Sequence, residues 1–154
     1  MRKKVAVILT AAVLTITPAL ADPVSDLIAE HNINRITAGA AEITGTPEVE
    51  EGKYIYHLPN IDIVISANDE GINSFSCVCF DESAVGEFLA QSVTAFYDIG
   101  GVGSYTSCYG ELLSEFLAAR AGIETKSNHF VPGVLFQVSK LKNGRYIFIV
   151  VKVK

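Results

Sequence analysis

The chain has 154 residues, enough for one domain, and a formal net charge of −5. Its 17 acidic residues outnumber its 12 basic ones, which argues against nucleic acid as the main partner, because phosphate binding needs a clustered basic face. Residues 125–154 hold five lysines, one arginine and no Asp or Glu. We interpret this basic end as a solvated strand edge and turn rather than a polyanion site, since lysines on edge strands also discourage edge-to-edge pairing.

Residues 1–21 are predicted to be a secretory signal peptide. Positive charge at residues 2–4 precedes an apolar run at residues 5–16, and the small-residue cleavage motif lies at 19–21. The alternative is an uncleaved membrane anchor, but a span needs roughly 20 apolar residues and this run is interrupted by Thr15, Thr17 and Pro18. We therefore expect an exported domain of residues 22–154, periplasmic or extracellular, without a stable membrane span.

The first elements of that domain are a short helix and a region of mixed character. Pro at the first helical position predicts a helix over residues 23–32, with His31 on its apolar face as a packed or half-exposed histidine. Residues 41–45 are predicted as an edge strand. The Pro- and Gly-containing acidic stretch at residues 46–52 is predicted as a loop.

Residues 54–58 and 61–65 are predicted to be two antiparallel strands joined at Pro59-Asn60. Pro59 excludes a primed turn, so the turn should be type I or II, or wider. This register places Leu58, Tyr56 and Tyr54 opposite Ile61, Ile63 and Ile65 on one apolar face. On the other face His57 lies opposite Asp62. We interpret these two residues as a cross-strand polar pair rather than half of a catalytic dyad, because no third member is near in sequence.

Residues 69–71 are predicted to be a hairpin loop that leads into a third strand. The register that this loop gives pairs Ile63 with Cys77 and Ile61 with Cys79, so that both thiols face the apolar side. Two amphipathic helices follow, at residues 85–96 and 106–121, the second with Gly122 just beyond its C-terminus. The glycine-rich residues 100–104 are interpreted as a connection, because they lack the Lys-Ser/Thr ending of a phosphate-binding loop.

Residues 134–153 are predicted to be a hairpin around Asn143-Gly144. A two-residue turn would pair Val138 with Ile149 and Phe136 with Val151. The predicted inward residues of this hairpin are Val134, Phe136, Val138, Ile147, Ile149, Val151 and Val153. In the predicted core, the helix residues Phe88, Val93, Leu112 and Phe116 pack against the sheet face that carries Ile63, Ile65 and Ile149.

Together these elements predict an α+β fold, with a mainly antiparallel sheet of five or six strands and helices packed on one face. The three cysteines suggest one disulfide in an oxidising compartment. We expect Cys77–Cys108, with Cys79–Cys108 as the alternative, because Cys108 begins a helix that should pack on the face carrying Cys77 and Cys79. Buried free thiols are the next interpretation, and a metal site or catalysis the weakest, since C-x-C lacks common zinc spacing.

No cofactor, catalytic or metal-binding motif is evident in the sequence. The leading hypothesis is a small exported binding or interaction domain, with another protein or a small apolar ligand as partner. One alternative is a thiol-dependent enzyme or redox protein using Cys108 with His57 or His129. The other is a carrier of a small apolar ligand lined by Tyr54, Tyr56 and Phe88.

Overall fold

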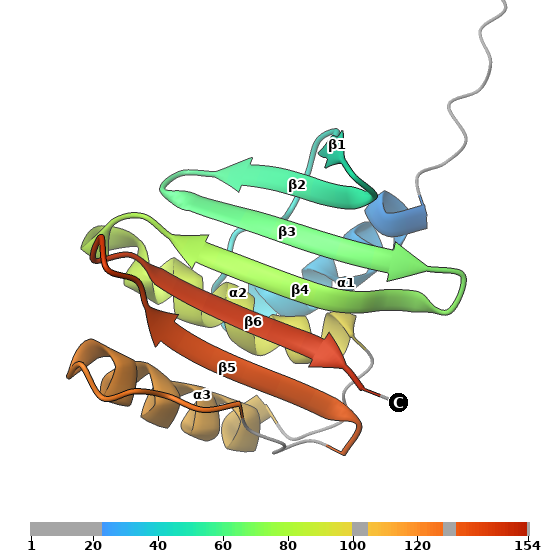
Figure 1. Ribbon diagram of the computed structural model, residues 1–154. Helices are drawn as coiled ribbons and strands as arrows, with labels where there is room; N and C mark the ends of the chain where they lie inside the picture. The colour runs from blue at the N-terminus through green and yellow to red at the C-terminus, as the bar shows by residue number, and fades with distance from the viewer. Residues whose placement is uncertain (1–22, 100–104, 128–131, 154) are drawn as a thin grey trace, which may run out of the picture.

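The computed structural model describes residues 23–99, 105–127 and 132–153, so the predicted signal peptide lies outside the described residues. The helices are α1 (Pro23–Ala38), α2 (Val85–Asp98) and α3 (Tyr105–Arg120), with a 3₁₀ turn at Glu82–Ala84 before α2. The strands are β1 (Glu48–Glu50), β2 (Lys53–Leu58), β3 (Ile61–Asn68), β4 (Gly71–Cys79), β5 (Val134–Lys140) and β6 (Tyr146–Lys152). They form one six-stranded sheet in the order β1-β2-β3-β4-β6-β5 (Figure 1).

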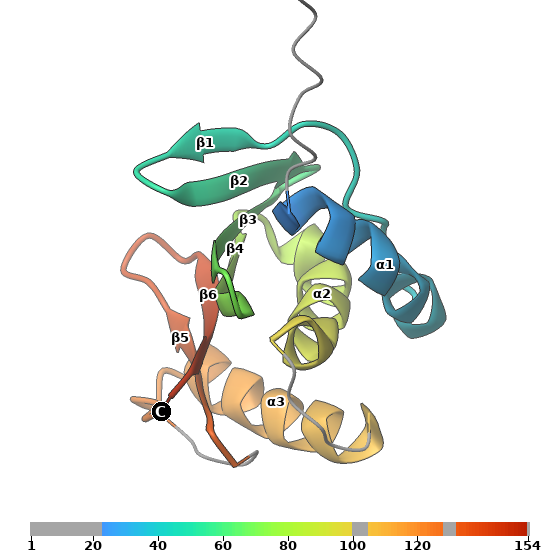
Figure 2. The ribbon, with the colours of Figure 1, turned by 90° about the vertical axis from the view of Figure 1, so that its right-hand side faces the viewer.

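All three helices lie on the same side of this sheet, as Figure 2 shows. Helix α2 packs on β4 at the middle of the sheet, α3 packs on β5, and α1 packs mainly on α2. We call the covered side the inner face and the opposite side the outer face. Every neighbouring pair of strands is antiparallel, which confirms the predicted α+β fold with helices on one face.

The register of the first hairpins agrees with the sequence prediction. Leu58 pairs with Ile61 and His57 with Asp62. Asn60 follows Pro59 with a φ of 58°, the positive angle that a type II turn needs at its third residue. Ile63 pairs with Cys77, as the register of the loop at residues 69–71 predicted. The alternation of apolar and polar residues therefore predicted the register of these strands correctly.

The C-terminal hairpin differs from the prediction by one residue. Val138 pairs with Phe148 and Phe136 with Val150, so Tyr146, Phe148 and Val150 face inward, and Ile147, Ile149 and Val151 face outward. The connection is residues 141–145: Leu141 and Arg145 bond across it, Gly144 has a φ of 82°, and Gly144 N–H donates to Leu141 C=O. The wider turn lets the helices cover two aromatic rings instead of smaller aliphatic side chains.

The other corrections concern residues 23–50. Helix α1 continues six residues beyond the predicted end at Asn32, because the inward stripe of Val24 and Ile28 is extended by two polar residues, Asn32 and Arg35. It ends at Gly39, whose φ of 77° accompanies the two closing hydrogen bonds of a Schellman motif. The predicted strand at 41–45 is wrong: the Asn32 side chain bonds both the N–H and the C=O of Ile43. The edge strand is β1 instead.

The core lies between the inner face and the helices and is rich in aromatic rings. Phe88 of α2 contacts Phe116 of α3, with ring centroids 6.1 Å apart, and Phe116 contacts Tyr146 at 4.9 Å. Farther along α2, Phe96 meets Phe136 edge to face at 5.2 Å. The predicted core residues Phe88, Val93, Leu112 and Phe116 are all buried, whereas Ile149, predicted beside them, is on the outer face and 40% exposed.

Candidate functional site

The three cysteines are buried free thiols, so the predicted Cys77–Cys108 bridge is not formed in the structure. The prediction assumed that α3 covers β4. Instead α2 covers that strand, and its Ser92 hydroxyl bonds to the Cys77 thiol, while α3 packs on β5, two strands away. Cys79 donates from its thiol to the Asp81 carbonyl at 3.1 Å.

The thiols are poorly suited to nucleophilic chemistry. Burial raises the pKa of Cys77 well above its ordinary value, and burial also raises the pKa of Cys79 and Cys108. A thiol reacts as its thiolate, so a raised pKa lowers reactivity at neutral pH. His129, one of the two histidines considered as a general base for Cys108, lies outside the described residues.

His57 and Asp62 form the predicted cross-strand pair on the outer face. The Nδ1 atom of His57 lies 2.6 Å from Asp62 Oδ1, and its Nε2 atom lies 3.4 Å from Glu48 Oε2. The hydrogen bond with Asp62 is the main cause that raises the pKa of His57. Because both ring nitrogens face carboxylates, neither is directed at a nucleophile. The geometry is that of an exposed polar triad on three neighbouring strands.

The proposed ligand-lining residues do not share one cavity. Phe88 is fully buried against Phe116 and Tyr146. Tyr56 borders a hollow of about 330 Å³ beside α1. Tyr54 lines a different cleft, of about 770 Å³, between α1 and the β3–β4 turn. Four carboxylates also line this second cleft, from Asp26, Glu30, Asp69 and Glu70, so its lining is unlike that of an apolar carrier site.

A buried charged cluster joins α1 to α2, and sequence reasoning missed it. Arg35 is completely buried and forms a two-pronged ion pair with Asp98, and its Nε atom donates to Gln91 at 3.0 Å. His31, half-exposed as predicted, lies 3.0 Å from the same carboxylate, and this bond raises the pKa of His31. Asp98 ends α2, where the helix dipole disfavours an anion, so the Arg35 guanidinium and the hydrogen bond with His31 compensate both burial and dipole. We assign this cluster to holding the helices together.

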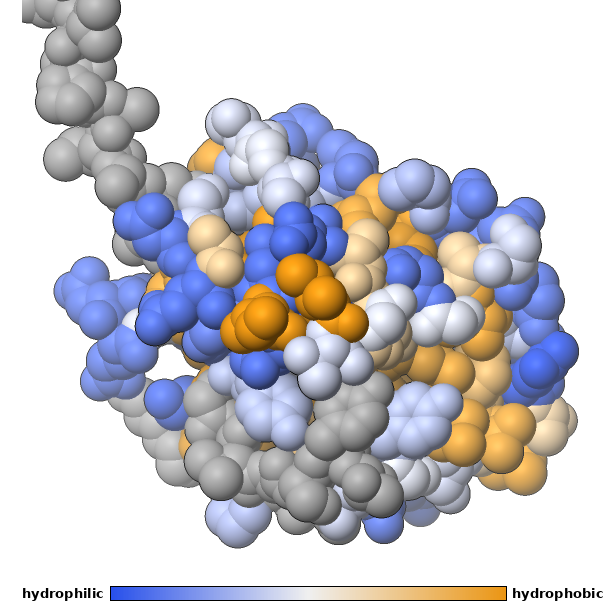
Figure 3. Space-filling view, turned by 180° about the vertical axis from the view of Figure 1, so that it is seen from behind, coloured by the Kyte–Doolittle hydropathy of each residue, from blue (hydrophilic) through white to orange (hydrophobic). Residues whose placement is uncertain are grey.

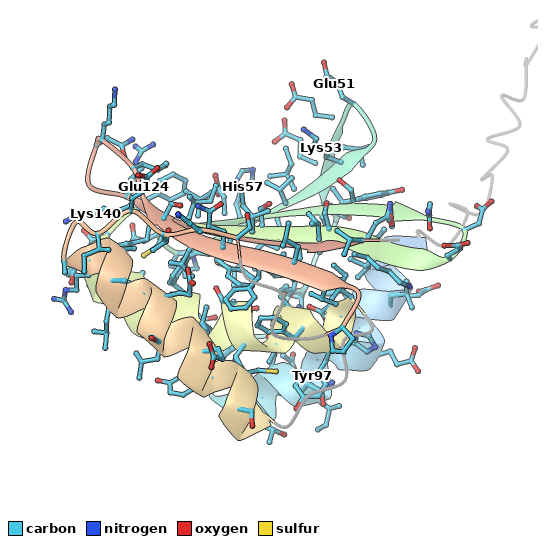
Figure 4. All side chains as sticks on the ribbon, turned by 60° about the horizontal axis from the view of Figure 1, so that its bottom comes forward. Glu51, Lys53, His57, Tyr97, Glu124 and Lys140 are labelled. Atoms are coloured by element: carbon cyan, nitrogen blue, oxygen red, sulfur yellow. The ribbon has the colours of Figure 1, made fainter. Side chains whose placement is uncertain are left out.

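No helix covers the outer face of the sheet (Figure 2). Figure 4 shows His57 on this side and Tyr97 of α2 on the opposite, helix-covered side. Strand pairing aligns the outward residues in rows, and one row runs Glu48, Ile55, Val64, Ser76, Ile149, Gln137 from β1 to β5. Seven aliphatic side chains face outward: Ile55, Val64, Val78, Leu135, Ile147, Ile149 and Val151.

Apart from Gln137 of β5, the outward polar residues are small or confined to the side of the sheet that holds β1, β2 and β3. Four serines lie among the aliphatic residues, and the charged outward residues of the rows belong to β1, β2 and β3. At one end of the face the Arg145 guanidinium lies 4.7 Å from the Phe80 ring. By contrast, the helix side, seen from behind in Figure 3, mixes hydrophobic groups with hydrophilic ones. Its exposed aliphatic residues include Ile33 and Ile36 of α1 and Leu117 of α3.

Both edges of the sheet are poorly suited to adding a strand. β1 is three residues long and contains Glu48 and Glu50. On the other edge, the Thr125 hydroxyl donates to the Val138 carbonyl, and the Glu115 carboxylate accepts from the Val138 N–H. Short, charged or occupied edges resist pairing with another chain. The face, rather than an edge, is therefore the candidate binding surface.

The described residues contain neither a metal-ligand cluster nor a helix suited to crossing a membrane. No group of three or more His, Cys, Asp or Glu side chains in them is placed to hold a metal ion. No described helix combines the length and apolar character that crossing a bilayer requires. Comparison of the chain with family models, curated proteins and solved structures found no match.

Proposed function

We propose that this protein is a small exported interaction domain that binds another protein through the outer face of its sheet. The observation that carries the proposal is the set of seven aliphatic side chains on that face, with Ile149 at its centre 40% exposed. Soluble monomers rarely leave more than a few hundred Å² of contiguous apolar surface in water, and larger patches mark interaction sites. A protein partner would remove this surface from water.

The buried thiols and the filled core give less support to the other two candidate functions, a thiol-dependent enzyme and a carrier of an apolar ligand. A thiol-dependent enzyme needs an accessible thiolate, whereas burial raises the pKa of Cys108. A carrier needs an apolar cavity, whereas rings of Phe116 and Tyr146 fill the space beside Phe88. The interaction role requires neither feature, and it uses a sheet face whose outward residues are mainly aliphatic or small.

Site-directed photo-crosslinking in cells that produce the protein tests this role. A benzophenone amino acid would replace Ser76 or Ile149 on the outer face, and Ile33 on α1 would serve as the matched control because it is also exposed. We expect covalent adducts with a protein chain from both outer positions and none from Ile33. Equal labelling at all three positions, or no adduct, would contradict the proposal.

Export is a separate part of the proposal and has its own test. If residues 1–21 are removed during secretion, N-terminal sequencing of the exported protein should begin at Asp22. Removal takes away Arg2, Lys3 and Lys4 and no acidic residue, so the net charge would change from −5 to −8. An exported protein that still begins at Met1 would contradict cleavage.

A further inference from the structure

We infer that the partner of the outer face is a second copy of this chain, packed sheet against sheet about a two-fold axis that runs parallel to the strands. This inference rests on the proposed interaction role of that face. It commits to one partner, and it is argued from the distribution of charge and from the size of the face.

Charge is separated across the width of the sheet. Residues 48–62, which span β1, β2 and the start of β3, hold four carboxylates and one lysine. At the other side of the sheet, the exposed Lys126 lies in the segment whose neighbouring residues bond to the outward Gln137 of β5, Arg145 lies against the Phe80 ring just before β6, and β5 and β6 contain no Asp or Glu. Glu124 lies near Lys140 at that side in Figure 4, but the excess of charge there remains basic.

This separation selects one of the two symmetric ways to stack the faces. A two-fold axis across the strands would put β1 of one copy over β1 of the other, acidic on acidic. An axis along the strands puts β1 over β5 of the partner copy and also β5 over β1, so each acidic side meets a basic one. An isologous interface repeats such a contact twice. Opposite potentials across an interface favour association, and like charges oppose it.

Row alignment names the groups that would meet. Rotation about an axis along the strands leaves each residue at the same height along the strand direction, so a row of one copy lies over the same row of the other copy in reverse order. Glu48, at the β1 end of its row, therefore faces Gln137, at the β5 end of that row in the other copy. Lys126 stands beside that position, because the Gln137 amide donates to the Thr125 carbonyl at 2.7 Å and the Ser127 hydroxyl lies 3.4 Å from Gln137 Oε1. Glu48 and Lys126 are therefore the acidic and basic partners.

The aliphatic residues lie where this arrangement needs them. Ile55 of β2 would face Ile149 of the other copy's β6 twice by symmetry, one strand in from each edge of the interface, and Val64 of β3 would face Ser76 of the other copy beside the axis. Six strands spaced about 4.8 Å and about seven residues long present a face of roughly 24 by 23 Å. That is on the order of 550 Å² in projection, near the roughly 800 Å² of accessible surface that a stable partner buries. Stacked twisted sheets align within about 30°.

Sedimentation equilibrium of the purified exported protein tests the inference. We expect wild type to have the mass of two chains. Ile149→Lys should weaken the dimer about 100-fold or more, because it buries an unpaired charge against Ile55 of the other copy. Ile33→Lys, the same change at an exposed position of α1, should leave the dimer intact. Circular dichroism of each variant establishes that the monomer remains folded.

Charge reversal tests the orientation. Glu48→Lys and Lys126→Glu should each weaken self-association, and mixing the two variants should restore a dimer of mixed composition. For wild type, adding sodium chloride should weaken the dimer, since salt screens opposite charges. A dimer that strengthens with salt would overturn the axis along the strands.

The outcomes separate this inference from the proposed function. A monomeric wild type, with crosslinks from Ser76 and Ile149 to a different protein, overturns the second copy and leaves the interaction role intact. A dimer that Ile33→Lys dissociates and Ile149→Lys does not would overturn the second copy on the outer face, and the absence of crosslinks from Ser76 and Ile149 would overturn the interaction role as well.

Discussion

Replacing one member of the Arg35–Asp98 ion pair should destabilise the protein far more than replacing both. Both side chains have no exposed surface, and the pair is also bonded to Gln91 and His31. Removing one partner leaves an uncompensated buried charge, which costs about 3–5 kcal/mol. Since the free energy of unfolding of small domains is about 5–15 kcal/mol, Arg35→Met or Asp98→Leu alone should remove about a fifth or more of the stability.

The double variant Arg35→Met, Asp98→Leu removes both charges together. Its remaining loss should come from the Gln91 side-chain oxygen, which loses the Arg35 Nε donor, and an unsatisfied buried acceptor costs about 1–3 kcal/mol. We therefore expect the double variant to be more stable than either single variant. Urea unfolding followed by circular dichroism, with an unchanged m-value, measures all three losses.

Two results would refute this reasoning. Single losses below about 1 kcal/mol would mean that the guanidinium finds water or another partner, as surface groups do. A double loss equal to the sum of the single losses would mean that the two side chains are not energetically coupled.

Three further predictions concern pH, packing and the thiols. The hydrogen bond with Asp98 raises the pKa of His31, so protonated His31 adds stability that is complete below pH 6.5 and is lost as pH rises through the raised pKa. In a His57→Gln background, which removes the other histidine with a raised pKa, the difference in unfolding free energy between His31 and His31→Gln should shrink over that pH range. A difference that stays constant with pH would contradict this prediction. Phe116→Ala should cost about 3–5 kcal/mol in urea unfolding, because the ring is buried between Phe88 and Tyr146; a loss below about 1 kcal/mol would place the helix elsewhere. Ellman's reagent should react slowly with native protein and count three thiols in denaturant; a count of one, with a bridged peptide on mapping, would instead support the disulfide.

Much of the sheet could be predicted because its signals are local. The positive φ of Asn60 after Pro59 and the alternation around Ile63 fix the meander without reference to other segments. Gly122 likewise ends α3 at the predicted place, with a φ of 78°. In each of these cases a few neighbouring residues determine the backbone, and no distant contact changes it.

The errors arise where distant contacts decide the structure. Arg35 reads as a solvent-facing residue in the sequence, and only the approach of Asp98, 63 positions later, allows it to be buried and α1 to continue. At the C-terminal hairpin, Asn143-Gly144 fits a two-residue turn, but burying Phe148 under α2 and α3 requires the wider one. The outer face was missed for the same reason, since a shift of one residue exchanges the two faces of β6.

Isoleucine-methyl NMR over a dilution series tests most directly whether the outer face binds a second copy. Two groups of isoleucines lie on opposite sides of the molecule: Ile55, Ile147 and Ile149 on the outer face, and Ile33 and Ile36 on α1. Exposed Ile123 follows α3 and belongs to neither group. We predict that dilution changes the signals of the first group and leaves those of the second group unchanged. Signals of the outer face that stay constant with concentration, or that change only together with Ile33 and Ile36, would contradict the account.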